Sequence, residues 1–101
     1  MGGVSEMAEW KTRQHLEDHY EFHRREFPGY SIEQYDASAQ ETIEVGARFA
    51  YRDRVTRERR VGYFHRDSSR FVAVDMDGFI RSHYRTDEAH VADLPQSTYR
   101  D

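Results

Sequence analysis

The chain has 101 residues, of which 37% are hydrophobic and 34% are charged, and its formal net charge at pH 7 is −4. These values suit one small domain with a modest core, and the aromatic fraction of 14% argues against a disordered chain. The sequence has no cysteine, which excludes disulfides and thiolate metal sites. No apolar run approaches the roughly 18 residues that a membrane span requires.

The charge is unevenly distributed along the chain. Eight arginines fall between Arg48 and Arg70, against only three carboxylates. Two interpretations stay open: a general bias of the composition toward arginine, or arginines selected for bidentate contacts with phosphate. The negative net charge by itself does not favour a nucleic-acid-binding protein.

The first predicted helix runs from Glu6 to about Glu26. An imperfect apolar stripe supports it, and neither proline nor glycine interrupts it. The dipeptide Pro28-Gly29 ends it, because proline removes a backbone donor and glycine favours a turn.

A second helix is predicted from Ile32 to about Ala50. Ser31 and Gln34 have the spacing of a capping box, in which each side chain bonds to the backbone N–H of the other residue. Apolar residues recur at helical spacing after this start, and Gly46 within the segment lets another backbone approach or weakens the last turn.

The next stretch, Tyr51–Arg60, reads as a charged connector that includes a short edge strand around Val55. The dipeptide Asp77-Gly78 is a strong hairpin signal, because glycine tolerates a positive φ. Three antiparallel strands are predicted around it, at Val61–His65, Phe71–Asp75 and Phe79–Tyr84.

The segment Arg85–Ala92 is expected to hold one helical turn that starts near Asp87. Leu94-Pro95 closes the ordered part, and Gln96–Asp101 is expected to be a frayed tail. We therefore expect a single domain over residues 1–101, ordered from about residue 6 to residue 94, with a flexible tail at 95–101. The expected fold class is α+β, with two N-terminal helices packed on an antiparallel meander of three to four strands.

Three histidines stand about one turn apart on the first predicted helix, at His15, His19 and His23. Two helical imidazoles at this spacing can bind zinc, but zinc needs a third ligand, and no glutamate directly follows His19 as it does in metalloprotease helices. Three roles stay open: a metal site, solvated histidines on a polar face, and a general base.

The last predicted strand carries further candidates. Strict alternation divides it into two faces, with Phe79, Arg81 and His83 on one and Ile80, Ser82 and Tyr84 on the other. Arg81 and Ser82 can therefore serve one site only at a rim, a twist or a bulge. Four arginines can either hold a phosphate or face solvent, namely Arg60, Arg66, Arg70 and Arg81.

A set of spaced residues resembles a known family: Leu16-xx-His19-xxx-His23, Phe27, Ser31-xxx-Tyr35 and Gly78-x-Ile80-Arg81-Ser82-x-Tyr84. The pattern is similar to the barnase–EndoU–RelE-like ribonucleases, which are small toxin domains of bacterial polymorphic toxins and of some phage proteins. The similarity covers about Leu16 to Leu94. Ser82 stands where the family usually has threonine, which keeps the hydroxyl.

The resemblance implies two helices on an antiparallel sheet and RNA cleavage that needs neither a metal nor another cofactor. We expect the 2′-hydroxyl to attack the adjacent phosphate. The expected site consists of His19 or His23 as base, His83 as acid, Arg81 with Arg60 or Arg70 on the phosphate, and Ser82 and Tyr84 as positioning groups.

The expected partners are RNA and an immunity or antitoxin protein, with no membrane involved. The cytoplasm is the expected site of action, with secretion of a parent toxin left open. Two alternatives remain: a non-catalytic protein-interaction module on the same fold, which the acidic helices favour, and a phage-associated protein of unknown role.

Overall fold

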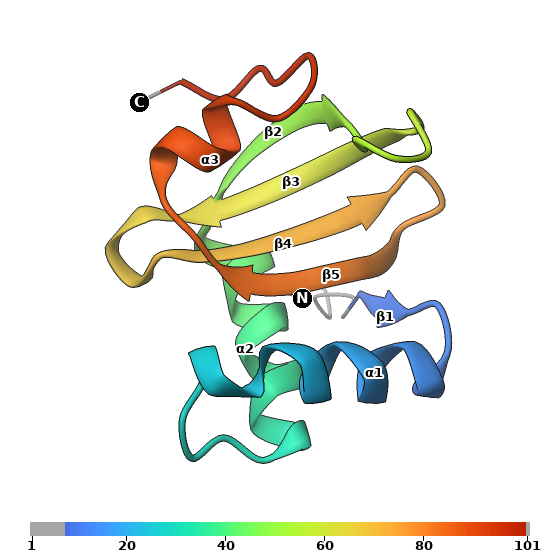
Figure 1. Ribbon diagram of the computed structural model, residues 1–101, viewed down its shortest axis with the longest axis vertical. Coiled ribbons are helices and arrows are strands. Elements are labelled where there is room, and N and C mark those ends of the chain that lie inside the picture. The colour runs from blue at the N-terminus through green and yellow to red at the C-terminus, as the bar shows by residue number, and fades with distance from the viewer. Residues whose placement is uncertain (1–7, 101) are drawn as a thin grey trace, which may run out of the picture.

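The computed structural model describes residues 8–100 and has an α+β fold, as the sequence predicts. Three helices accompany a five-stranded sheet whose strand order is β1-β5-β4-β3-β2 (Figure 1). Single turns of 3-10 helix follow α1 and β3. In chain order the elements are β1 (Glu9–Trp10), α1 (Arg13–His23), α2 (Ile32–Val45), β2 (Ala47–Arg52), β3 (Arg59–His65), β4 (Arg70–Asp75), β5 (Phe79–Arg85) and α3 (Glu88–Ala92).

The three predicted strands are present as β3, β4 and β5, and neighbouring strands from β2 to β5 pair antiparallel. The turn before β5 has Gly78 at φ 90°, as the Asp-Gly signal predicts. The sheet is nevertheless mixed, because β1 pairs parallel with β5 through Glu9 and Trp10. The expectation of a purely antiparallel sheet of three to four strands is therefore wrong in detail.

The first helix begins later than predicted. Thr12 caps it by accepting a hydrogen bond from the backbone N–H of His15, so α1 starts at Arg13, and Glu6 lies outside the described residues. The preceding Trp10 is extended and 8% exposed, and its indole N–H donates to Asp36 on α2. The tryptophan therefore belongs to a short strand instead of the apolar stripe of the helix.

The second helix has the predicted capping box at Ser31 and Gln34 but ends at Val45, not near Ala50. A Cβ at Gly46 would lie 2.6 Å from the carbonyl oxygen of Thr42, so glycine is required where the chain leaves the helix. The residues after it form β2, the strand that the helical assignment missed. The expected strand around Val55 is wrong, since this residue is 89% exposed in a turn.

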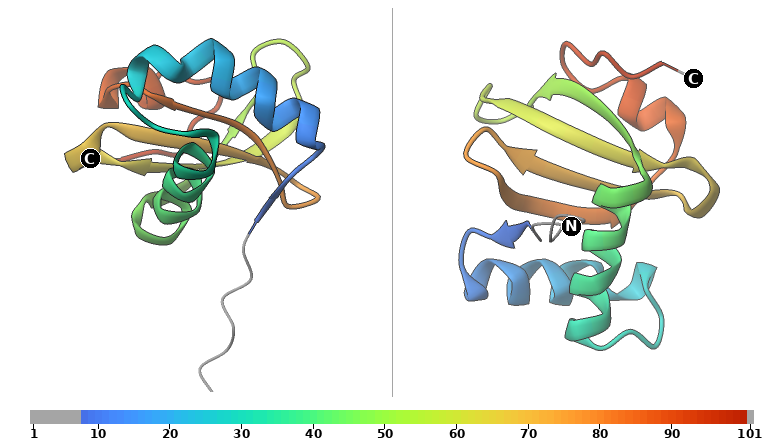
Figure 2. Two further views of the ribbon diagram at one scale, coloured as in Figure 1. Left: turned by 90° about the horizontal axis from the view of Figure 1, so that it is seen from below. Right: turned by 180° about the vertical axis from the view of Figure 1, so that it is seen from behind.

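Helix α2 packs on one face of the sheet, α3 and the C-terminal segment lie on the other, and α1 lies along the β5 edge (Figures 1 and 2). The core on the α2 side joins Trp10, Leu16, Phe27, Tyr35, Ala39, Val72, Val74 and Ile80. The core on the α3 side joins Phe49, Tyr51, Phe64, Phe71, Ala73, Val91, Leu94 and Tyr99. Both faces of the sheet are therefore partly covered. No helix among residues 8–100 is long and apolar enough to cross a membrane.

The C-terminal segment differs from the expected frayed tail. The backbone N–H of Thr98 donates to the carbonyl of Ala50 at 2.9 Å, and that of Arg52 donates to Pro95 at 2.8 Å. Tyr99 is 7% exposed in the core on the α3 side. These residues are ordered because they form hydrogen bonds with backbone groups at the outer edge of β2. The sequence pattern predicts a helix for this segment, so it gives no reason to expect an open strand edge there.

The ring of Phe49 lies across Gly62, its cross-strand partner on β3. A Cβ built at Gly62 would lie 2.4 Å from the Cζ atom of Phe49. The aromatic ring thus occupies the volume that any other residue at position 62 would need.

We expect Gly62→Ala to lower the free energy of unfolding by about 1–3 kcal/mol, because the added methyl group overpacks the core. Elsewhere in a strand, replacing glycine by alanine is usually favourable. When Phe49→Leu is already present, adding Gly62→Ala should lower the free energy of unfolding by less than it does in the native protein. Chemical denaturation measures both effects, and a neutral or stabilising Gly62→Ala would contradict this account.

Candidate functional site

A cleft of about 320 Å³ opens beside β5, between α1 and α3, on the side of the sheet opposite α2. Its lining is rich in histidine, arginine and tyrosine. The polar groups considered below come from four parts of the fold: His15 and His19 from α1, Arg60 from β3, Arg81, Ser82 and Tyr84 from β5, and His90 from α3.

A β-bulge explains how neighbouring residues of β5 reach one site. Ser82 pairs with Ala73 and Ile80 pairs with Val74, so Arg81 is the extra residue on the bulged strand. Arg81 and Ser82 both line the cleft, while Ile80 is buried on the α2 side. The strict alternation predicted for this strand is wrong, and the bulge supplies the condition under which both groups can serve one site.

Three arginines line the cleft, and one of them, Arg54, pairs with Asp93. Arg81 is held by Asp75, whose carboxylate accepts a hydrogen bond from it at 3.4 Å and also accepts from the backbone N–H groups of Asp77 and Phe79. Arg60 is only 5% exposed, and its nearest carboxylate is Glu58 at 3.8 Å. Asp75 thus fixes Arg81 by a hydrogen bond and burial restricts Arg60, and positioned cations of this kind can stabilise a phosphate.

The histidines of α1 form a ladder of aromatic contacts. The ring of His19 lies 4.7 Å from that of His15, 5.9 Å from that of His23 and 5.6 Å from that of Trp10, measured between centroids. Burial and then its two histidine neighbours lower the pKa of His19 to about 4. His19 is therefore neutral at pH 7 and can accept a proton.

The two outer histidines of the ladder have different surroundings. His15 lines the cleft, and burial followed by the charge of Arg81 lowers its pKa. His23 does not line the cleft. Its Nδ1 lies 2.9 Å from Glu26, and its ring stacks on Tyr84 with the centroids 5.3 Å apart. The structure thus separates the two helix residues between which the sequence could not choose.

Sequence reasoning missed His90, which lies across the cleft from the ladder on α3. Its Nε2 is 3.0 Å from the hydroxyl oxygen of Tyr84. Burial raises the pKa of Tyr84 to about 12, so the phenol stays protonated at pH 7. The one available signal was Asp87, which caps α3 by accepting from the backbone N–H of His90.

His83 lies away from the cleft, which corrects its expected place in the site. It is fully buried on the α2 side, with its ring 4.8 Å from that of Phe27 and 5.0 Å from that of Tyr35. Because Arg81 is extra in the bulge, His83 falls on the same face as Ile80. No substrate bound in the cleft can contact this imidazole.

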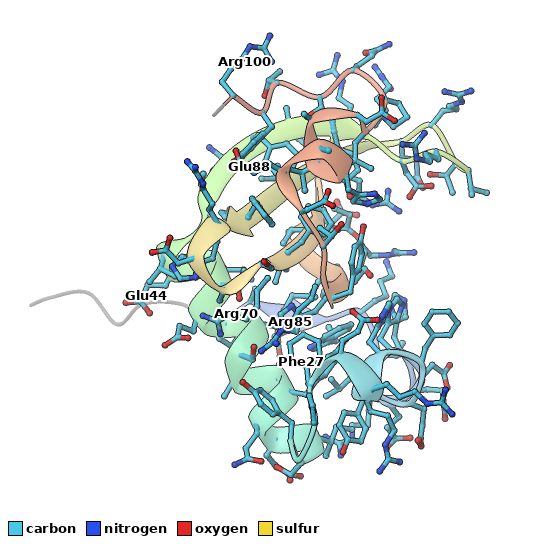
Figure 3. All side chains as sticks on the ribbon, turned by 60° about the vertical axis from the view of Figure 1, so that its left-hand side comes forward. Phe27, Glu44, Arg70, Arg85, Glu88 and Arg100 are labelled. Atoms are coloured by element: carbon cyan, nitrogen blue, oxygen red, sulfur yellow. The ribbon has the colours of Figure 1, made fainter. Side chains whose placement is uncertain are left out.

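Arg70 also lies away from the cleft, on the α2 side of the sheet. Its guanidinium forms an ion pair with Glu41 at 2.7 Å and donates to the hydroxyl of Ser38 at 3.1 Å. It is only 8% exposed beside α2 (Figure 3). Arg70 therefore supports the packing of α2 on the sheet, and the phosphate contact expected for it is not possible in the cleft.

The hydrogen bonds around His83 fix its tautomer. Ser38 accepts from Arg70 and so directs its own hydroxyl proton to Nε2 of His83, at 3.0 Å. Nδ1 then donates to the carbonyl of Phe71, also at 3.0 Å. If Nε2 were protonated, it could no longer accept the hydrogen bond of Ser38, and a second positive charge would lie near the guanidinium of Arg70. Burial, aided by the charge of Arg70, lowers the pKa of His83 to about 4.

No group of three or more His, Cys, Asp or Glu side chains that could hold a metal ion occurs among residues 8–100. No family model, no curated protein and no solved structure matches this chain. The function is therefore inferred from the chemistry of the cleft.

The buried His83 predicts a pH-dependent stability. An unfolded chain binds a proton at this residue near pH 6.5, whereas the folded protein resists it to about pH 4. The unfolded state thus binds more protons in this window, and the free energy of unfolding falls as the pH falls, by up to about 1.4 kcal/mol per pH unit for one histidine.

Denaturation between pH 7 and pH 4 measures this slope. We expect His83→Gln to make it shallower, while the matched control His65→Gln leaves it as in the native protein. An unchanged slope in His83→Gln would contradict the account.

Proposed function

We propose that this protein is a metal-independent endoribonuclease that cleaves RNA by attack of a 2′-hydroxyl on the adjacent phosphate. The observation that carries the proposal is the composition of the cleft. Histidines from α1 form one wall, the His90–Tyr84 pair forms another, and the guanidiniums of Arg81 and Arg60 line the same space. Proton-transfer groups around fixed cations are what this reaction requires.

In the proposed first step, His19 removes the proton from the 2′-hydroxyl of the bound nucleotide. His19 suits this task because it lines the cleft and is neutral at pH 7. The deprotonated 2′-oxygen then attacks phosphorus, and a new O2′–P bond forms. His15 stands one turn away and keeps a second imidazole beside the reacting group.

Arg81 and Arg60 stabilise the negative charge that builds on the phosphate oxygens during this attack. Ser82 adds a hydroxyl that orients the phosphate, because the bulge brings it to the same cleft as Arg81. The carboxylate of Asp75 holds Arg81 from behind and so fixes its direction.

In the proposed second half of the reaction, the bond between phosphorus and the 5′-oxygen breaks, and the imidazolium form of His90 donates a proton to the departing oxygen and becomes neutral. Tyr84 positions His90 through their hydrogen bond. The products are a 2′,3′-cyclic phosphate and a free 5′-hydroxyl. The proton taken by His19 and the proton given by His90 balance, so no external reagent is consumed.

A relation to the barnase–EndoU–RelE-like ribonucleases is part of the proposal. Its support is the order of elements, with α1 and α2 preceding the antiparallel strands β2 to β5, and the Gly78-x-Ile80-x-Ser82-x-Tyr84 pattern, of which Ser82 and Tyr84 line the cleft. This relation would give the protein a toxin role in the cytoplasm of a target cell. It would also give it an immunity or antitoxin protein as partner.

The proposal predicts that His19→Gln and His90→Gln each lower the rate of RNA cleavage by about 10²–10⁴-fold, because each removes a proton-transfer group. His65→Gln is the matched control, since His65 lies outside the cleft. Purified variants are incubated with total RNA in the presence and absence of EDTA, and circular dichroism verifies that each is folded.

Full activity in both His19→Gln and His90→Gln would rule out this mechanism, and loss of activity with EDTA would indicate a metal site instead. A folded native protein that cleaves no RNA would favour the non-catalytic protein-interaction module.

A further inference from the structure

A second cavity, of about 380 Å³, opens at the ends of β2 and β3 that meet at their connecting loop. Its lining contains four arginines, namely Arg48, Arg52, Arg59 and Arg60, and, in the part of the chain that the structure describes, no aspartate or glutamate. We call this surface the arginine groove. An apolar patch of Ala50, Val61 and Met76 lies within it, and Met76 is 65% exposed.

The strand register concentrates positive charge in the arginine groove. Arg52 and Arg59 are direct cross-strand partners, so two like charges face each other on neighbouring strands. Such pairs are destabilising unless an anion lies between them. Within residues 8–100 the guanidinium of Arg52 donates to two neutral acceptors, the carbonyl of Arg57 and the amide oxygen of Gln96.

The other two exposed arginines of the groove, Arg48 and Arg59, form no ion pair within residues 8–100. Elsewhere on the protein, Arg13, Arg24 and Arg66 each pair with a glutamate. Arg48 and Arg59 therefore carry positive charge that no carboxylate among the described residues pairs with.

The spacing of the arginines indicates an extended polyanion and not a single small ion. Arg48 and Arg52 are four residues apart on one strand, which is about 13 Å at the usual rise of a β-strand. One phosphate cannot contact both Arg48 and Arg52, whereas successive phosphates of one nucleic-acid strand can. Guanidinium groups suit such contacts because they bind phosphate bidentately.

The edge of β2 argues against an acidic peptide as the occupant. A peptide usually binds a sheet by adding a strand to an open edge. Here the C-terminal segment already bonds to that edge, through Pro95 to Arg52 and through Thr98 to Ala50. The exposed apolar patch of the groove instead offers a surface for the flat face of an unpaired base.

We propose that the arginine groove binds the sugar–phosphate backbone of single-stranded RNA outside the cleft, as an extension of the substrate site. This inference rests on RNA being the substrate. The arginine groove and the cleft adjoin each other at the end of β2, because Arg52 lines the groove and the next two residues, Asp53 and Arg54, line the cleft. Arg60 lines both. A strand that leaves the cleft over this connection reaches the groove.

The first test measures binding of an oligoribonucleotide methylated at every 2′-oxygen, which cannot be cleaved by the proposed reaction. The double variant Arg52→Gln/Arg59→Gln should bind it about tenfold more weakly at low salt. Affinity should also depend less steeply on salt: the negative slope of log affinity against log salt should become smaller in magnitude by about 1.4, since each lost phosphate contact on a single strand contributes about 0.7. Fluorescence anisotropy gives both values.

The control is Arg13→Gln/Arg24→Gln, which removes the same charge from arginines that already pair with glutamates on the helix side. It should keep the native affinity and the native slope. Equal losses in the two double variants would overturn the proposal, because net charge would then account for the binding. Native binding in Arg52→Gln/Arg59→Gln would overturn it as well.

A second test separates the groove from the cleft. In Arg52→Gln/Arg59→Gln, kcat/KM should fall about tenfold for a long single-stranded RNA and stay unchanged for a dinucleotide, which fills only the cleft. If the native protein cleaves neither substrate, the proposed function fails, while the binding test still decides the groove. Tighter binding of poly-glutamate than of the oligonucleotide at these arginines would identify a protein partner and overturn the RNA proposal.

Discussion

The extra residue in β5 is the constraint on which the cleft depends. It is fixed on one side by the pairing of Val74 with Ile80 and on the other by the pairing of Ala73 with Ser82. Beyond it, the carbonyl of His83 accepts the hydroxyl of Tyr35, which joins the strand to α2. Because the buried residues on either side of the bulge face the α2 core, the two polar residues between them are directed into the cleft. The polar site is thus a product of packing on the opposite face of the sheet.

Much of the fold could be predicted because its signals are local. The capping box at Ser31, the Asp77-Gly78 turn and the cap at Asp87 each act within a few residues, and the structure contains all three. Strand β2 could not be found in this way, because Ile43, Gly46 and Phe49 continue a helical spacing into a segment whose real partner is β3. Strand β1 has only two residues and exists through its pairing with β5, which no local pattern reveals.

The candidate site was predictable in part, for a related reason. Arg81, Ser82, Tyr84 and His19 could be selected from their chemistry and their spacing, and the structure places all four at the cleft. The face on which His83 lies depends on how many residues of β5 oppose β4, which is a property of two strands together. His90 lies in a short polar helix, and only the folded chain brings it to Tyr84.

The parallel pairing of β1 with β5 determines when during folding the cleft can form. Glu9 pairs with Phe79, so β1 cannot be fixed in the sheet until β5 is available. Closing so long a loop is entropically costly and places this contact late in folding. During synthesis on the ribosome, α1 therefore has no complete sheet to pack against, and its histidines cannot meet the groups of β5 and α3. The cleft is therefore expected to form only after β5 and α3 have left the ribosome.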